Sequence, residues 1–219
     1  LEMSSKYSMT NLLKRWSLIN SIKHIKNEKI EGDFVECGVW KGGNLIIYDY
    51  LNEKYQLGKK IYAYDTYAGM SEPSVYDKNY LDIDAKNEWD KSKKTENINL
   101  SFNCYSSIQE VKNNVENNSQ NKNSLKNFKF IEGNVEETLK IKDNLPSKIS
   151  ILRLDTDWYE STKAELEILF PRLSKNGILI IDDYGHWKGA RKAVDEYFFD
   201  KNVTIHFVDF SCRMIIKTF

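Results

Sequence analysis

Two short runs of the sequence are almost wholly apolar, and they limit the possible folds more than any other feature. They span residues 149–154 and 178–181, and helical patterns follow each of them at residues 161–173 and 188–199. Short apolar runs of this kind are typical of strands that are buried on both faces, as in a parallel sheet covered by helices. The order strand, helix, strand, helix therefore predicts an α/β fold with a mostly parallel sheet.

The rest of the chain extends the same alternation. Residues 9–25 read as one amphipathic helix, and a second helix begins near Gly42. Three further strands are expected at residues 34–36, 60–65 and 128–131. The runs 203–208 and 213–217 lie too close together for a helical crossover, so they should pair as an antiparallel hairpin.

The 219 residues suit a single domain, residues 1–219, with residues 1–30 as an N-terminal helical cap.

Two polar stretches interrupt the alternation of strands and helices. Residues 71–100 follow a strand end, so they are either an active-site lid or a dispensable loop. The asparagine-rich residues 111–127 are expected to be a loosely structured surface excursion. The N-terminal helix would serve either a homo-oligomer contact or a cofactor lid.

Charge and cysteine content exclude several classes of protein. Lysine plus arginine and aspartate plus glutamate both number 32, so no net field favours nucleic acid or an anionic membrane. No apolar run reaches the roughly 18 to 20 residues needed for membrane insertion. The three cysteines have no metal-ligand spacing and fit a reducing compartment, so we expect a cytoplasmic protein.

A glycine-rich turn follows the first strand at residues 36–43. It begins with an acid, Glu36, and reads Glu-x-Gly-x-x-x-Gly, whereas a dinucleotide fingerprint reads Gly-x-Gly-x-x-Gly. Gly38 and Gly42 permit a tight turn and close approach of a ligand, and the next helix starts with free amide groups. The acid-first form resembles the first motif of class I methyltransferases, in which the acid helps to hold the amino-acid end of S-adenosylmethionine.

The ends of the next two strands carry further candidate cofactor ligands. Asp65 ends the second strand, where an acid commonly accepts the ribose hydroxyls of a nucleotide. Gly133 and Asn134 end the third strand, where the adenine would lie. The alternative for Asp65 and for Asn134 is a helix-capping role.

Four carboxylates follow the two apolar strands that first indicated the fold. Asp155 and Asp157 come after the fourth strand, and Asp182 and Asp183 come after the fifth. Neighbouring strand ends converge on one crevice, where these groups would repel one another unless protons or a cation compensate. A hard divalent cation such as Mg²⁺ prefers oxygen ligands of this type. Capping of the following helix is the alternative for Asp157.

Longer motifs resemble one family closely, the metal-dependent macrocin O-methyltransferases, which methylate deoxysugars of macrolide antibiotics. The resemblance implies a Rossmann-like class I methyltransferase fold with a seven-stranded sheet in the order 3-2-1-4-5-7-6 and helices on both faces. It also implies cofactor contacts by Glu36, Gly38, Asp65 and Thr66, with Gly43 and Asp155 close by, and metal ligation by Asp155, Asp182 and Asp183. The motifs are GDFVECGVWKGG at 32–43, YDTYAGMS at 64–71, LRLDTDWYEST at 152–162, DDYG at 182–185 and GARKAVD at 189–195.

The chemistry implied is S-adenosylmethionine- and Mg²⁺-dependent methyl transfer to a hydroxyl. The metal would lower the pKa of the acceptor hydroxyl, and a base would remove its proton. Candidates for that base are Asp155, Asp157 and His186. Tyr67 and Trp158 depart from the usual family pattern, so a macrolide acceptor is not carried over.

We expect a sugar or nucleotide-sugar acceptor, as in surface-polysaccharide biosynthesis. Alternatives are a macrolide or other small-molecule hydroxyl, an NAD-dependent oxidoreductase, and a non-catalytic glycan-binding module.

Overall fold

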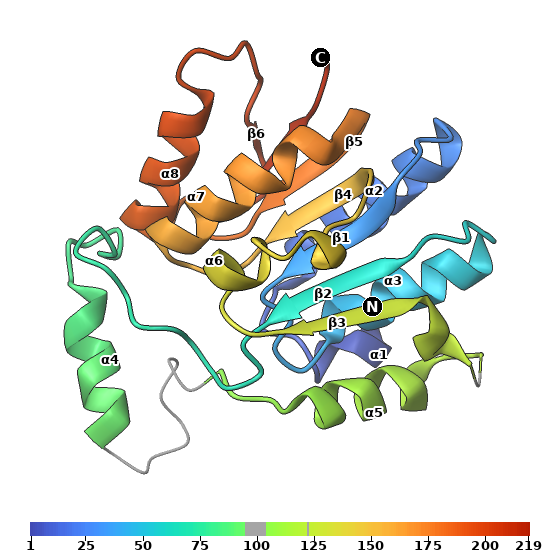
Figure 1. The fold of residues 1–219 in the computed structure, drawn as a ribbon, viewed down its shortest axis with the longest axis horizontal. Helices are drawn as coiled ribbons and strands as arrows, with labels where there is room; N and C mark the ends of the chain where they lie inside the picture. Colours follow the sequence, from blue (N-terminus) through green and yellow to red (C-terminus); the bar gives the residue numbers. More distant parts are fainter. Residues whose placement is uncertain (95–103, 122) are drawn as a thin grey trace.

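The computed structural model describes residues 1–94, 104–121 and 123–219 (Figure 1). Its centre is a seven-stranded sheet in the order β3-β2-β1-β4-β5-β7-β6, as expected. The first five strands run parallel, and β7 pairs antiparallel with β5 and with β6. The strands are β1 (Asp33–Cys37), β2 (Ile61–Asp65), β3 (Phe128–Glu132), β4 (Ile149–Leu154), β5 (Leu173–Ile181), β6 (His206–Phe207) and β7 (Arg213–Ile216).

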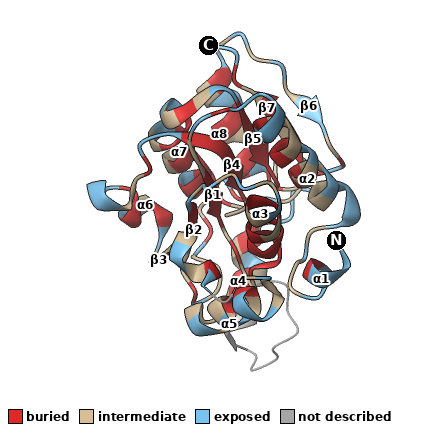
Figure 2. Cartoon of the chain, turned by 90° about the vertical axis from the view of Figure 1, so that its right-hand side faces the viewer, coloured by how far each residue is buried: buried red, intermediate tan, exposed pale blue. Residues whose placement is uncertain are grey.

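Helices cover both faces of the sheet because successive strand side chains point to opposite faces. One face packs against α2 (Leu12–Asn27), α3 (Gly43–Lys54) and α5 (Ile108–Asn118). The other packs against α6 (Val135–Thr138), α7 (Tyr159–Ile168) and α8 (Lys188–Phe198). The central strands are accordingly buried almost throughout (Figure 2).

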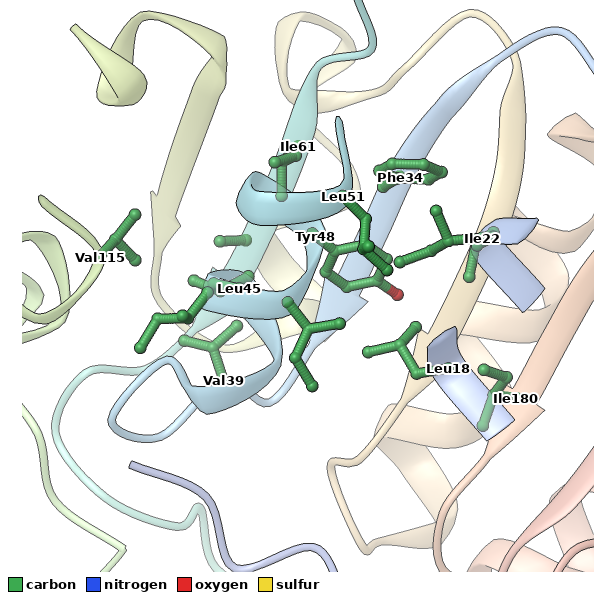
Figure 3. Close-up of a cluster of buried hydrophobic side chains, with 14 of the residues drawn as sticks. Leu18, Ile22, Phe34, Val39, Leu45, Tyr48, Leu51, Ile61, Val115 and Ile180 are labelled. Carbon is green, nitrogen blue, oxygen red and sulfur yellow. The ribbon is translucent and has the colours of Figure 1, made fainter. Parts of the chain in front are cut away.

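The core on the α2 and α3 face shows how this packing is built (Figure 3). Phe34 of β1 stacks on Tyr48 of α3 with ring centroids 5.0 Å apart. Leu18 and Ile22, one turn apart on α2, are also fully or almost fully buried in this cluster. The predicted N-terminal helix is therefore fixed on the sheet by its apolar side, beginning at Leu12.

Two expectations about local structure were wrong. The fifth strand begins at Leu173 and not near residue 178, because α7 ends at Ile168 and a 3₁₀ turn with Pro171 follows it. The asparagine-rich stretch contains α5 and is not a loose excursion. Val111 and Val115, one helical turn apart, are both fully buried and fix α5 against the domain.

The segment expected to be a lid or a dispensable loop begins with irregular chain and continues into α4 (Ala85–Lys94), while residues 95–100 lie outside the described residues. Asp77 is fully buried and accepts hydrogen bonds from the Ser74 amide at 2.6 Å and the Tyr159 amide at 2.8 Å. The Asp77 carboxylate thus attaches the segment to the start of α7. No helix in the described parts of the chain is long and apolar enough to cross a membrane.

Candidate functional site

A cavity of about 630 Å³ opens at the carboxyl ends of the parallel strands. The loops that follow β1 to β5 form its floor, and residues 7–10 and Lys14 close one side. Residues 69–71, Asn79 and Glu88 contribute the side formed by the segment after β2. This is the position in which open α/β sheets bind their ligands.

The turn after β1 allows the backbone of two loops to meet. Gly38 has φ +81°, and a Cβ there would lie 2.0 Å from the Asp155 carbonyl oxygen. The amide of Gly43, at the start of α3, donates to the Tyr7 carbonyl at 2.9 Å. The N-terminal segment, and not a ligand, therefore uses the first amide of this helix. Gly42 lies outside the cavity and packs against Val111.

Glu36 places one carboxylate at the base of the cavity. Its Oε1 accepts from Asn44 Nδ2 at 2.9 Å and from Arg153 Nη1 at 2.7 Å. Its Oε2 is buried and has no hydrogen-bond partner among the described residues. Burial raises the pKa of this carboxyl, while Arg153 and Asn44 oppose that shift. A cationic group of a ligand would satisfy the remaining oxygen.

Asp65 braces the loops around the cofactor side of the cavity. Its Oδ2 accepts the Val39 and Trp40 amides at 2.7 and 3.1 Å, and its Oδ1 accepts the Tyr67 amide at 2.8 Å. The bonds from Val39 and Trp40 cross from β2 to the turn after β1, whereas the bond from Tyr67 lies within the loop after β2. No described helix starts at Asp65. The side chain thus does not cap a helix, and it fixes the loop that a ribose would face. Asn134 occupies an N-cap position without a side-chain capping bond.

Arg153 is the centre of the carboxylate cluster. Its guanidinium is 3% exposed and contacts Glu36, Asp155 and Asp182. The Asp155 contact is 2.9 Å, and Arg153 Nη2 pairs with Asp182 Oδ2. A second protein cation, Lys14, pairs with Asp182 Oδ1. The negative charge at the strand ends is therefore partly compensated from within the chain.

The remaining carboxylates, Asp157 and Asp183, affect each other's protonation. Burial and then the charge of Asp155 raise the pKa of Asp157 to about 7. Burial and then Asp157 raise that of Asp183. Asp157 has φ +67° and accepts Trp187 Nε1 at 3.0 Å, while the N-cap of α7 is Trp158. Asp157 therefore does not cap the helix, and its strained backbone aims it at the cavity.

His186 also lines the cavity, in contact with aromatic rings. Its ring lies 5.6 Å from that of Tyr80 and 4.7 Å from that of Trp187, centroid to centroid. Burial, followed by the positive charge of Lys14, lowers its pKa below the usual value.

The structure gathers the expected site residues in one place. All of them except Gly42 line the cavity: Glu36, Gly38, Gly43, Asp65, Thr66, Gly133, Asn134, Asp155, Asp157, Asp182, Asp183 and His186. Lys14 and Arg153 were missed. An arginine within an otherwise apolar strand was a usable signal for Arg153, because a buried guanidinium requires carboxylate partners. Nothing in the sequence around Lys14 distinguished it from the other lysines of α2.

Comparison with known proteins decides the family. The macrocin O-methyltransferase (TylF) family matches residues 4–214. The chain belongs to the macrocin O-methyltransferase family. As a member of it, the chain is an S-adenosylmethionine-dependent O-methyltransferase.

Relatives with named activities are similar to this chain over most of its length. A tetracenomycin 4'-O-methyltransferase from Streptomyces olivaceus, which acts on the dimethoxy-rhamnosyl compound, is 27% identical over 202 residues, covering 89% of this chain and 68% of the relative. Demethyldecarbamoylnovobiocin O-methyltransferase from Streptomyces niveus is 26% identical over 204 residues, with the same coverage. The solved O-methyltransferase NovP superposes with a TM-score of 0.79 at 25% identity, covering 97% of this chain and 83% of NovP.

The donor chemistry of the cavity fits the two groups that this family implies. For the cofactor, the unpartnered Glu36 Oε2 suits the ammonium of a bound amino acid. For a divalent cation, the buried Asp183 Oδ2 lacks a hydrogen-bond partner among the described residues, whereas Asp182 Oδ1 is paired with the Lys14 ammonium. No three carboxylate, histidine or cysteine residues in the described parts of the chain are already arranged as a metal site. The oxygen set is suitable, but it is held by protein cations.

Proposed function

We propose that this enzyme transfers a methyl group from S-adenosylmethionine to a sugar hydroxyl with the help of a divalent cation such as Mg²⁺. The observation that carries the proposal is one cavity that joins Glu36 and Asp65, on the cofactor side, to the cluster of Asp155, Asp157, Asp182 and Asp183. The cofactor supplies the reactive methyl group, so the protein must position the acceptor and accept its proton.

The cofactor side is organised by Glu36 and Asp65. Glu36 Oε2 would receive the ammonium of the methionine part, because its other oxygen is already paired with Arg153 and Asn44. Asp65, fixed by three amides, would accept one ribose hydroxyl with the remaining lone pair of Oδ1. Gly133 and Asn134 close the end of the cavity in which the adenine would lie.

The acceptor side is organised by four aspartates. Asp155, Asp182 and Asp183 would hold the divalent cation, which lowers the pKa of a coordinated hydroxyl. We assign Asp157 as the base that takes the proton. It lines the cavity beside the proposed metal ligands without being one of them, and the hydrogen bond from Trp187 Nε1 fixes one of its oxygens. His186, on the aromatic side, would contact the acceptor instead.

A sugar is the acceptor class that the site supports best. The tetracenomycin methyltransferase named above acts on a rhamnosyl compound. The walls near His186 and Trp187 offer aromatic rings together with the polar Asn79 and Glu88. A free or nucleotide-linked sugar in surface-polysaccharide biosynthesis is our preferred acceptor, and a cytoplasmic location is the corresponding expectation.

The test is a methyl-transfer assay with a panel of sugars, nucleotide sugars and glycosylated small molecules. We expect formation of S-adenosylhomocysteine with a sugar-bearing acceptor, loss of turnover in EDTA and recovery on addition of Mg²⁺. Full turnover in chelator would remove the metal from the proposal and leave methyl transfer in place. If only phenols without a sugar were methylated, the proposed sugar acceptor would be wrong.

A further inference from the structure

Lys14 holds the place that a divalent cation would need beside Asp182. It lies in the first turn of α2, and its side chain is 16% exposed. Its ammonium pairs with Asp182 Oδ1, while Arg153 pairs with Asp182 Oδ2. Both oxygens of this carboxylate are therefore engaged by cations of the protein.

From this arrangement, and resting on the metal role in the proposed function, we propose that Lys14 is a built-in competitor of the divalent cation. The metal binds Asp182 only when the Lys14 ammonium leaves it. A doubly charged ion and an ammonium cannot share one carboxylate oxygen without strong mutual repulsion at that distance. The affinity of the site for metal is then set by how easily Lys14 is displaced.

Lys14 is the cation that can leave, because Arg153 cannot. Arg153 is buried, and three carboxylates contact its guanidinium. Lys14 has one ion pair, a flexible stem and a position on the cavity wall. Its ammonium also faces the charges of Asp183 and Asp155. Its departure would therefore remove the positive charge beside Asp182 Oδ1 and Asp183, while Arg153 keeps its contacts with Asp155 and with Asp182 Oδ2.

The movement would be confined to the side chain, since the backbone at this point is anchored. Asn11 caps α2 with its Oδ1, which accepts the Lys14 amide at 3.0 Å. The Nδ2 of the same side chain donates to Asp209 Oδ2 at 2.6 Å. The start of the helix is thus tied to the turn between β6 and β7, and a change of Lys14 rotamer suffices to vacate Asp182.

Titration calorimetry with Mn²⁺ and Mg²⁺, without cofactor, tests the competition directly. Lys14→Met removes the ammonium and keeps the stem, so it should tighten metal binding by about ten-fold or more. Lys14→Arg keeps the positive charge and should keep the weak binding. Lys23→Met, a change on the same helix away from the cavity, should equal the wild type.

Amine labelling of the wild-type protein provides a measurement that no folding defect can obscure. Added Mg²⁺ should increase the reactivity of Lys14 several-fold, while Lys23 stays unchanged as the internal control. Equal or weaker metal binding by Lys14→Met, or protection of Lys14 by Mg²⁺, would overturn the competition.

The two levels of failure can be told apart. If the wild type binds Mg²⁺ through the aspartates and Lys14→Met binds it no more tightly, the metal role stands and the proposed competition is wrong. Should neither protein bind Mg²⁺ or Mn²⁺, the competition and the metal role both fail, and methyl transfer from S-adenosylmethionine is judged separately from the assay in chelator.

Discussion

Arg153 of β4 and Glu36 of β1 are partners in the register of two neighbouring parallel strands, and Arg153 Nη1 donates to Glu36 Oε1 at 2.7 Å in the interior. The same guanidinium reaches Asp155 and Asp182. One buried cation thus links Glu36, which we propose as a cofactor ligand, to Asp155 and Asp182, which we propose as metal ligands.

Arg153→Met should destabilise the protein by about 3–5 kcal/mol, because three carboxylates lose a buried partner. Urea denaturation measures the change. Arg191→Met is the matched control, since Arg191 is 60% exposed and pairs with Asp195 one turn away, so it should cost below about 1 kcal/mol. Equal effects of the two changes would contradict a structural role for the buried cation.

Asp65→Asn should weaken binding of S-adenosylhomocysteine by about ten-fold or more, because charge-assisted bonds to three amides are lost or weakened. Calorimetry provides the measurement. Asp33→Asn serves as control, because Asp33 accepts the Lys60 amide at the opposite end of β1. An unchanged affinity of Asp65→Asn for S-adenosylhomocysteine would show that these three hydrogen bonds are not needed for cofactor binding.

Asp157→Asn should lower turnover by about 10²- to 10⁴-fold, the usual contribution of a positioned base. Binding of S-adenosylhomocysteine should stay as in the wild type, because Asp157 belongs to the acceptor side. His186→Gln should retain most of the turnover and change the KM for the acceptor. The reverse result, with His186→Gln the inactive variant, would move the base to the histidine.

Glu165→Gln should flatten the dependence of stability on pH. Glu165 is fully buried in α7, Thr156 Oγ1 donates to it at 3.0 Å, and burial raises its pKa well above the ordinary value. The folded state therefore keeps this proton above the pH at which the unfolded state releases it. Stability contributed by Glu165 falls as pH rises from the unfolded pKa toward the folded one.

Denaturation at pH 6 and at pH 9 checks the effect of Glu165→Gln. The variant should lose less stability than the wild type between these two values. Glu160→Gln, an exposed change in the first turn of the same helix, should follow the wild type. Parallel pH profiles for wild type and Glu165→Gln would contradict the assignment.

Asp77→Ala should raise the KM for the acceptor and leave the affinity for S-adenosylhomocysteine unchanged. The buried carboxylate attaches residues 71–94 to α7, and Asn79 and Glu88 of that segment line the cavity. Asp84→Ala provides the comparison, since Asp84 accepts only the nearby Lys86 amide among the bonds described here. If Asp84→Ala had the same kinetic effect, the anchor at Asp77 would have no special role.

The sheet order was predicted through the family resemblance of the motifs. The edge of the sheet at which the site lies was predicted by the acids that follow the apolar strand runs, because neighbouring strand ends of a parallel sheet converge there. It did not predict Arg153 and Lys14 as partners of these acids. The contact of Arg153 with Glu36 depends on the register of β1 and β4. The contact of Lys14 with Asp182 depends on how α2 packs on the sheet. The helix within the asparagine-rich stretch was missed because Val111 and Val115 are its only fully buried apolar residues.

The contact between Gly38 and the Asp155 carbonyl has a practical meaning for redesign. The backbone of the turn after β1, the proposed cofactor loop, and the backbone of Asp155, a proposed metal ligand, meet with no side chain between them. A substitution that shifts either loop will disturb the other, so these loops offer little freedom for changing acceptor preference. Variation aimed at a new hydroxyl should instead be concentrated on the segment after β2, which borders the cavity with Met70, Ser71, Asn79 and Glu88.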